Sequence, residues 1–238
     1  PTTRDIDDAF FAETLPGGGI RLCLALADPA LDWEFGGPLD VAVARRASSL
    51  YLPEGVSHML PECLGTDLYS LRAGEVRPSL VMEWEFAADG DIVGFAMRKT
   101  FVRVAENTCY AVVEAALDRG GAPEHIVLGW KLAVLLRDKR LERGAVIIER
   151  PEPEIVLTGY PDDVQVDMAV CPSYPKAQLL VSELMILGNT AAAEYAVSHG
   201  AAMLFRTQDA SLPPEIRGVH ADPPAIQRAV RELPPTLT

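Results

Sequence analysis

The sequence lacks the features that mark membrane proteins, secreted proteins and zinc-thiolate proteins. No apolar run approaches the roughly 20 residues that a membrane-spanning helix needs. The first residues are acidic, whereas a signal peptide begins with basic residues and continues with apolar ones. The four cysteines include no Cys-x-x-Cys pair, which argues against a zinc site and is typical of reduced thiols. We therefore expect a cytoplasmic protein with no membrane partner.

Signatures of several common enzyme classes are also missing. The four histidines show no metal-ligand spacing, no Ser-His-Asp arrangement stands out, and no Gly-x-Gly-x-x-Gly loop is present. Positive charge is scarce, since the formal net charge is −13, whereas a free-standing nucleic-acid binder usually has a basic face. Lysine and arginine are enriched only in residues 98–143. An acidic segment beside a basic one suits a metal site that receives phosphates, and an ordinary acidic protein fits equally well.

A dense group of acids lies near the start of the sequence, where Asp5, Asp7 and Asp8 fall within four residues. At contact distance, each pair of like charges repels by about 1 to 4 kcal/mol, depending on the local dielectric. Hard divalent cations such as Mg²⁺ relieve this repulsion and prefer oxygen ligands. The segment therefore predicts a magnesium site, with an acidic turn in solvent as the alternative. A third interpretation is an Asp-nucleophile phosphatase-like hydrolase, which predicts an apolar strand running into Asp5 and a doubly wound parallel sheet.

Periodicity and turn signals predict a fold of the α+β class, because strands come first and helices lie among the later ones. Strands are expected over residues 8–14, 20–27, 80–86, 92–104, 145–149, 154–158, 164–169 and 202–206. Helices are expected over residues 39–50, 110–118, 126–143, 177–199 and 224–233. Glycine-containing turns at residues 16–19 and 87–90 predict two hairpins in the first half of the chain.

Several short stretches form an ordered series along the chain. They are Arg4-Asp5-Ile6-Asp7-Asp8-Ala9-Phe10, Ala25-Leu26-Ala27-Asp28-Pro29, Tyr51-Leu52-Pro53, Met59-Leu60-Pro61, LRAGEVRP at residues 71–78, Leu135-Leu136-Arg137 with Arg140, Gly144-Ala145, and ELMILGN at residues 183–189. In order and approximate spacing, this series resembles the RNB catalytic domain of the ribonuclease II/ribonuclease R family of exoribonucleases. The resemblance implies a mixed, mostly antiparallel and partly barrel-like sheet packed with several helices.

The resemblance also implies a reaction. The family consists of hydrolytic, processive enzymes that degrade single-stranded RNA from its 3′ end and release nucleoside 5′-monophosphates. Asp5, Asp7 and Asp8 match its metal-binding and catalytic aspartates. A pair of Mg²⁺ ions, or Mn²⁺ in their place, is the implied cofactor, since two such ions activate the attacking water and stabilise the phosphate charge.

Three further residues match positions that line the RNA in this family. Tyr51 matches an aromatic residue that stacks on nucleotides near the 3′ end, and Tyr110 and Glu183 match residues along the terminal nucleotides. Each has a structural alternative. The two tyrosines could be packing residues, and Glu183, close to the start of a helix, could favour the helix dipole.

The chain also departs from the family pattern. The family has a further aspartate six positions before the match of Asp5, and that place falls before Pro1. Its Ser-Pro-Leu/Ile-Arg-Arg/Lys-Tyr block and its flanking OB-fold RNA-binding domains would lie outside residues 1–238. We therefore expect an RNB catalytic domain truncated at both ends, weak or inactive alone, whose RNA-decay partners the sequence does not identify. The alternative is an RNB fold that binds RNA and has lost its chemistry.

Overall fold

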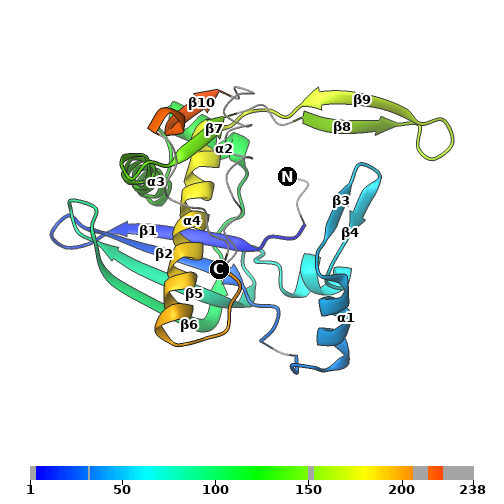
Figure 1. Cartoon of the computed structure of the whole chain (residues 1–238), viewed down its shortest axis with the longest axis horizontal. Helices are drawn as coiled ribbons and strands as arrows, with labels where there is room; N and C mark the ends of the chain where they lie inside the picture. The colour runs from blue at the N-terminus through cyan, green and yellow to red at the C-terminus, as the bar shows by residue number, and fades with distance from the viewer. Residues whose placement is uncertain (1–3, 32, 150–152, 206–213, 222–238) are drawn as a thin grey trace. The chain divides into compact units, whose positions relative to one another are not determined.

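The computed structural model describes residues 4–31, 33–149, 153–205 and 214–221, which divide into two compact units (Figure 1). The first unit comprises Pro1–Gly129 and Pro153–Ala169, and the second comprises Trp130–Glu152 and Val170–Thr238. Across the described residues, no helix is both long enough and apolar enough to cross a membrane. The fold is α+β with mostly antiparallel pairing, as the sequence predicts.

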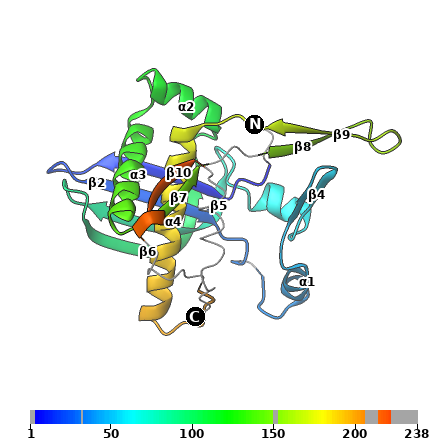
Figure 2. The ribbon, with the colours of Figure 1, turned by 45° about the horizontal axis from the view of Figure 1, so that its top comes forward.

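The first unit is built on a four-stranded antiparallel sheet with the order β1-β2-β5-β6, which Figure 1 and Figure 2 show from two directions. The strands are β1 (Asp8–Thr14), β2 (Ile20–Ala27), β5 (Val76–Phe86) and β6 (Ile92–Arg103). Both predicted hairpins are confirmed. In the first turn, Gly17 and Gly18 have φ angles of 96° and 87°, which residues with a Cβ rarely adopt.

One face of this sheet forms the core of the first unit. Leu22 pairs with Trp84 and Leu24 with Met82 across the β2–β5 ladder, and all four side chains are at most 2% exposed. Burying an apolar side chain of this size contributes about 1.5 to 3 kcal/mol relative to leaving it in water. This face therefore fixes the register of the strands, because a one-residue slip would turn the apolar set toward solvent.

Shorter elements complete the first unit. They are α1 (Pro38–Arg46), the hairpin β3 (Leu50–Leu52) and β4 (Gly55–Ser57), the π-helical turn η1 (Leu64–Leu68), α2 (Tyr110–Asp118) and the strand β8 (Pro153–Thr158), which pairs with β9 (Gln165–Val170). The helix predicted over residues 39–50 ends earlier than expected. Its last turn closes at Ala47, which has a φ of 61°, and the following residues enter the β3–β4 hairpin, which the sequence analysis missed.

The second unit contains most of α3 (Glu124–Glu142), the strand β7 (Val146–Glu149), α4 (Pro175–Ser198), η2 (Pro214–Ile216) and β10 (Gly218–Ala221). The buried residues of α4 recur at helical spacing, as expected for a helix with one mostly apolar face; they are Ala177, Leu180, Glu183, Leu184, Leu187, Gly188, Ala191 and Ala196. Gly200 caps the end of α4, since it has a φ of 61° and the Ala201 N–H donates to the Ala196 carbonyl at 2.9 Å.

Two predictions for the C-terminal part have other outcomes. The strand predicted over residues 202–206 is wrong for residues 202–205, which have no regular structure, while residue 206 lies outside the described residues. The helix predicted over residues 224–233 also lies outside them. The strand β10, which pairs in parallel with β7, was missed by the sequence analysis.

Candidate active site

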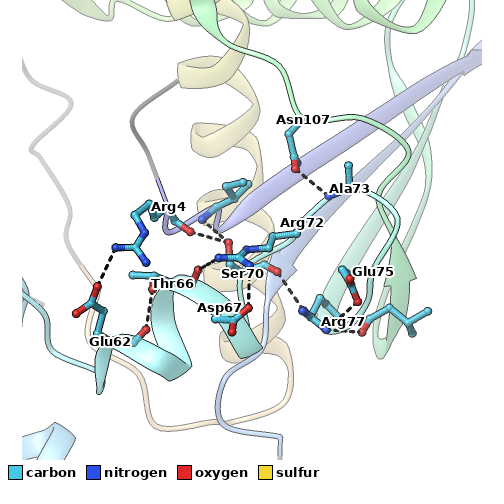
Figure 3. Close-up of polar contacts among 12 residues, drawn as sticks. Arg4, Glu62, Thr66, Asp67, Ser70, Arg72, Ala73, Glu75, Arg77 and Asn107 are labelled. Carbon is cyan, nitrogen blue, oxygen red and sulfur yellow. Dashed lines mark hydrogen bonds and ion pairs between the residues drawn. The ribbon is translucent and has the colours of Figure 1, made fainter.

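The acidic segment, residues 4–8, leads into β1 and is held by the buried hydroxyl of Ser70 (Figure 3). The Ile6 N–H donates to Ser70 Oγ at 3.0 Å, and Ser70 Oγ donates to the Arg4 carbonyl at 2.9 Å. Ser70 is 0% exposed. Because the two bonded groups belong to the peptide units on either side of Asp5, one side chain fixes the backbone of Asp5.

Backbone hydrogen bonds hold the rest of the segment. The Leu71 N–H donates to the Ile6 carbonyl at 2.8 Å, and the Ala27 N–H donates to the Asp7 carbonyl at 2.8 Å. Asp8 is the first residue of β1. The main chain of all three acids is therefore tied to the sheet and to the loop that carries Ser70.

That loop is itself fixed by two arginines (Figure 3). Arg72 donates from Nη2 to the Thr66 carbonyl at 2.8 Å and pairs with Asp67 at 2.9 Å. Arg77 donates from Nε to the Ser70 carbonyl at 3.3 Å. The two arginines thus hold this loop through carboxylate and backbone contacts.

Asn107 closes the other side of the loop. Its Nδ2 donates to the Leu71 carbonyl at 2.9 Å, and its Oδ1 accepts from the Ala73 N–H at 2.8 Å. Sequence analysis missed both Asn107 and Ser70. The available signal for Ser70 was its place between Tyr69 and Leu71, where a hydroxyl among apolar neighbours must find a partner if it is buried.

The structure brings two of the predicted site residues together: Tyr51 donates from its hydroxyl to Asp5 Oδ2 at 2.9 Å. Tyr51 lies on β3 and is 69% exposed, so its ring faces solvent. The pKa of Tyr51 is raised, first by this hydrogen bond, then by burial of the hydroxyl and by the charges of Asp5 and Asp7. A carboxylate thus lies directly beside an exposed aromatic ring.

The pKa values of the other two acids are raised, chiefly because their carboxylates are partly buried. Partial loss of hydrating water raises the pKa of Asp7, and the charges of Asp5 and Asp8 raise it further. The pKa of Asp8 is raised by burial. Both side chains still reach solvent. The three carboxylates therefore form one electrostatic group, in which a positive charge would be favoured.

The donor set suits a hard cation, because all three predicted ligands are carboxylate oxygens. Within the ranges that the structure describes, no group of three or more His, Cys, Asp or Glu side chains is arranged to hold a metal ion. The chemistry of the acidic segment thus fits Mg²⁺, and the side chains do not form a complete ligand cage. Metal binding by Asp5, Asp7 and Asp8 stays a prediction.

The two remaining predicted site residues lie on helices. Tyr110 is the first residue of α2 and is 44% exposed. Glu183 lies on α4 in the second unit and is 2% exposed. Its two carboxylate oxygens accept hydrogen bonds from Arg140, at 3.0 Å from Nε and at 2.6 Å from Nη2. A contact from Glu183 to RNA would therefore involve a carboxylate already bound to a guanidinium, and both RNA-binding roles stay predictions.

The phosphatase interpretation of the acidic segment is wrong. It requires an apolar strand that ends at Asp5 within a doubly wound parallel sheet. Instead, the acids precede and begin β1, and the sheet that β1 joins is antiparallel.

Comparison with known proteins gives one family for most of the chain. A model described as the RNB domain matches residues 1–232. Exoribonuclease 2 of Escherichia fergusonii is 34% identical over 204 residues, which cover 81% of this chain and 31% of that protein. The first curated relatives are matched over only 17% to 31% of their own length.

Two solved structures extend the comparison to three dimensions. RNase R of Mycoplasma genitalium, solved with double-stranded RNA, matches with a TM-score of 0.77 and 25% identity, over 87% of this chain and 37% of that chain. Yeast Ssd1, described as a pseudonuclease, matches with a TM-score of 0.63 and 16% identity, over 85% of this chain and 25% of that chain. The second likeness shows the fold alone.

Proposed function

The chain belongs to the RNB domain family, and on this basis we propose that it forms the catalytic part of a metal-dependent 3′-to-5′ exoribonuclease. The proposed substrate is single-stranded RNA, and the proposed products are nucleoside 5′-monophosphates, released processively. In each cycle, the oxygen of a water forms a bond to the last phosphorus. The bond from that phosphorus to the preceding 3′ oxygen breaks, and this oxygen takes up a proton.

The acids of residues 5–8 are the proposed ligands for Mg²⁺, with Mn²⁺ as the alternative ion. When bound, such ions supply an activated water and stabilise charge on the phosphate oxygens. The contribution of the protein is to hold Asp5, Asp7 and Asp8 in place, through Ser70 and the backbone bonds to the sheet. A fixed main chain loses little freedom when the site is loaded, which favours binding.

We assign RNA binding to aromatic and polar side chains. The exposed ring of Tyr51 offers a stacking face for a base, which is worth about 1 to 3 kcal/mol per base without sequence preference. Tyr110 and Glu183 are proposed to contact the terminal nucleotides, where a carboxylate could accept from a ribose 2′-hydroxyl and so favour RNA over DNA. None of the four cysteines forms a disulfide, which suits a reducing compartment such as the cytoplasm.

One observation carries the proposal: the hydroxyl of an exposed aromatic residue is bonded to a member of the acidic segment. Stacking alone occurs in many RNA-binding surfaces, and acidic clusters alone occur in many solvated turns. Hydrolysis at the 3′ end of a stacked RNA strand requires an aromatic face directly beside clustered carboxylates. The second candidate is an RNB fold that keeps RNA binding without hydrolysis; yeast Ssd1, described as a pseudonuclease, shares the fold.

The test uses the full-length protein and the substitution Asp7→Asn. A single-stranded RNA labelled at its 5′ end is incubated with Mg²⁺ and resolved at single-nucleotide resolution. We expect the unmodified protein to shorten the labelled RNA stepwise. The Asp7→Asn protein should leave this RNA intact, while its RNA affinity changes little. Asp162→Asn, at an exposed position outside the acidic segment, is the control for the loss of one negative charge.

The outcomes separate the candidates. Unchanged turnover by Asp7→Asn would remove Asp7 from the mechanism. RNA binding by the unmodified protein without any shortening, in Mg²⁺ and in Mn²⁺, would establish the non-hydrolytic alternative.

A further inference from the structure

Tyr51 has two chemically separate parts that face different partners. Its ring is largely in solvent, and its hydroxyl donates to Asp5 Oδ2 at 2.9 Å. Stacking on a base needs only the ring, because a phenyl ring offers a comparable aromatic face. The hydroxyl is therefore free to serve another purpose, and the residue that it contacts is a proposed metal ligand.

The hairpin that carries Tyr51 is weakly anchored. Each of β3 and β4 has three residues, all of them exposed. Two hydrogen bonds tie the chain at its base: Arg46 Nη1 donates to the His58 carbonyl at 2.7 Å, and the Met59 N–H donates to Ser49 Oγ at 2.9 Å. A two-stranded hairpin this short is marginal by itself, so its position responds to whatever binds its exposed face.

Asp5 differs, because its backbone is fixed on both sides by the buried Ser70 hydroxyl. The freedom that Asp5 retains is rotation of its side chain. Tyr51 restricts that rotation by occupying Oδ2, which leaves Oδ1 available to a cation. A hydrogen bond to the second oxygen of a ligating carboxylate is a common way to orient a metal ligand.

We propose that the Tyr51 hydroxyl is a positioning group for Asp5, which couples base stacking on the ring to the orientation of a metal-binding carboxylate. This inference rests on the proposed function. A base stacked on the ring fixes the hairpin, the fixed hairpin holds the hydroxyl on Oδ2, and Asp5 then presents Oδ1. By linkage, RNA raises the affinity for the cation and the cation raises the affinity for RNA by the same factor.

The experiment measures this factor directly by binding. In the unmodified full-length protein, with an RNA analogue whose 3′-terminal linkages resist hydrolysis, RNA affinity is measured with chelator and with saturating Mn²⁺. Mn²⁺ affinity is measured with and without the RNA analogue. Coupling between two sites is typically 5- to 150-fold. We expect a factor in this range for the unmodified protein, and a factor close to one for Tyr51→Phe.

Two further variants separate the hydroxyl from the ring. In RNA degradation, Tyr51→Phe should keep the end-product length of the unmodified protein while needing about tenfold more Mn²⁺. Tyr51→Ala should also lengthen the shortest product, because it removes the stacking face. Tyr160→Phe, a tyrosine of similar exposure on the β8–β9 hairpin, is the matched control and should leave the coupling factor unchanged.

Either of two results would overturn the inference: a coupling factor unaltered by Tyr51→Phe, or no measurable Mn²⁺ binding to the unmodified protein. Failure of the proposed function is read separately, from the RNA ladder of the unmodified protein. If Tyr51→Phe abolishes the coupling but the unmodified protein does not shorten RNA, the positioning role of Tyr51 stands and the proposed hydrolysis is rejected.

Discussion

Replacing Ser70 with alanine tests whether the acidic segment is held in place by one buried hydroxyl. The substitution removes the acceptor of the Ile6 N–H at 3.0 Å and the donor to the Arg4 carbonyl at 2.9 Å. It leaves the backbone bond between the Leu71 N–H and the Ile6 carbonyl intact, so the segment should shift locally and keep its general position. The perturbation is therefore centred on the backbone of Asp5.

The magnitude follows from the two lost hydrogen bonds. Each contributes about 1 kcal/mol net, and a backbone group left unpaired and partly buried costs up to about 3 kcal/mol. We expect the free energy of unfolding to fall by about 2 kcal/mol. In a chain of this size that corresponds to a decrease in Tm of about 4 to 8 °C.

The effect on turnover should be larger than the effect on stability. Catalytic groups must be held within about 0.5 Å of their productive positions, and a misplacement of about 1 Å can cost about 100-fold in rate. We expect Ser70→Ala to lower kcat by 10- to 100-fold, with a small change in KM, because Tyr51 and its stacking face are left intact.

The assay compares two buried serines in the full-length protein, by thermal unfolding and by RNA degradation under single-turnover conditions. Ser79 is also 0% exposed, and its hydroxyl makes a hydrogen bond at 3.5 Å to the Arg77 carbonyl rather than to the acidic segment. Ser79→Ala should lower stability by less than about 1 kcal/mol and leave kcat unchanged. Equal turnover by the two variants would refute the argument that Ser70 positions Asp5.

Two further predictions concern charge. Arg140→Met should lower the unfolding free energy by about 3 kcal/mol, because it leaves the buried Glu183 carboxylate without its partner; denaturant unfolding should show most of the loss restored when Glu183→Met is added. Asp7→Asn should raise Tm at pH 7 in chelator. Because the pKa of Asp7 is raised in the folded protein, the protonated carboxyl stabilises the fold at pH values below 3.8, the pKa in the unfolded chain. This stability is lost as the pH rises through the pKa in the folded protein. The gain from Asp7→Asn should therefore disappear below about pH 4, and a gain equal at both pH values would contradict this cause.

Local sequence signals predicted the larger elements because those elements are determined by neighbouring residues. The glycine turn at residues 16–19 and the Asp89-Gly90 pair set both hairpins of the sheet, and the bounds of α2 were predicted without error. The missed elements are those that depend on distant partners. β10 is four residues long and exists because it pairs with β7, some seventy positions earlier in the sequence. No local pattern carries that information.

The candidate site divides in the same way. Residue type and spacing identified the acids, since close carboxylates are visible in the sequence, and the resemblance to the RNB domain indicated Tyr51. Their supports were not visible, because Ser70 is 64 positions from Ile6 and Arg140 is 43 positions from Glu183. Glu183 shows the consequence. Its place on a helix suggested a dipole or RNA role, and only the fold reveals that Arg140 already neutralises it.

The way the acids are held bears on why a cation would bind there. Three free carboxylates in four residues could relieve their repulsion by moving the backbone apart. Here hydrogen bonds fix the main chain at Asp5, Ile6 and Asp7; their partners are Ser70, Leu71 and Ala27 respectively. The backbone therefore cannot move to separate the carboxylates. The raised pKa of Asp7 follows first from burial and then from the charges of Asp5 and Asp8, and protons or cations relieve both costs. Near neutral pH protons are scarce, so the divalent ion that we propose would draw part of its affinity from the stability of the surrounding fold.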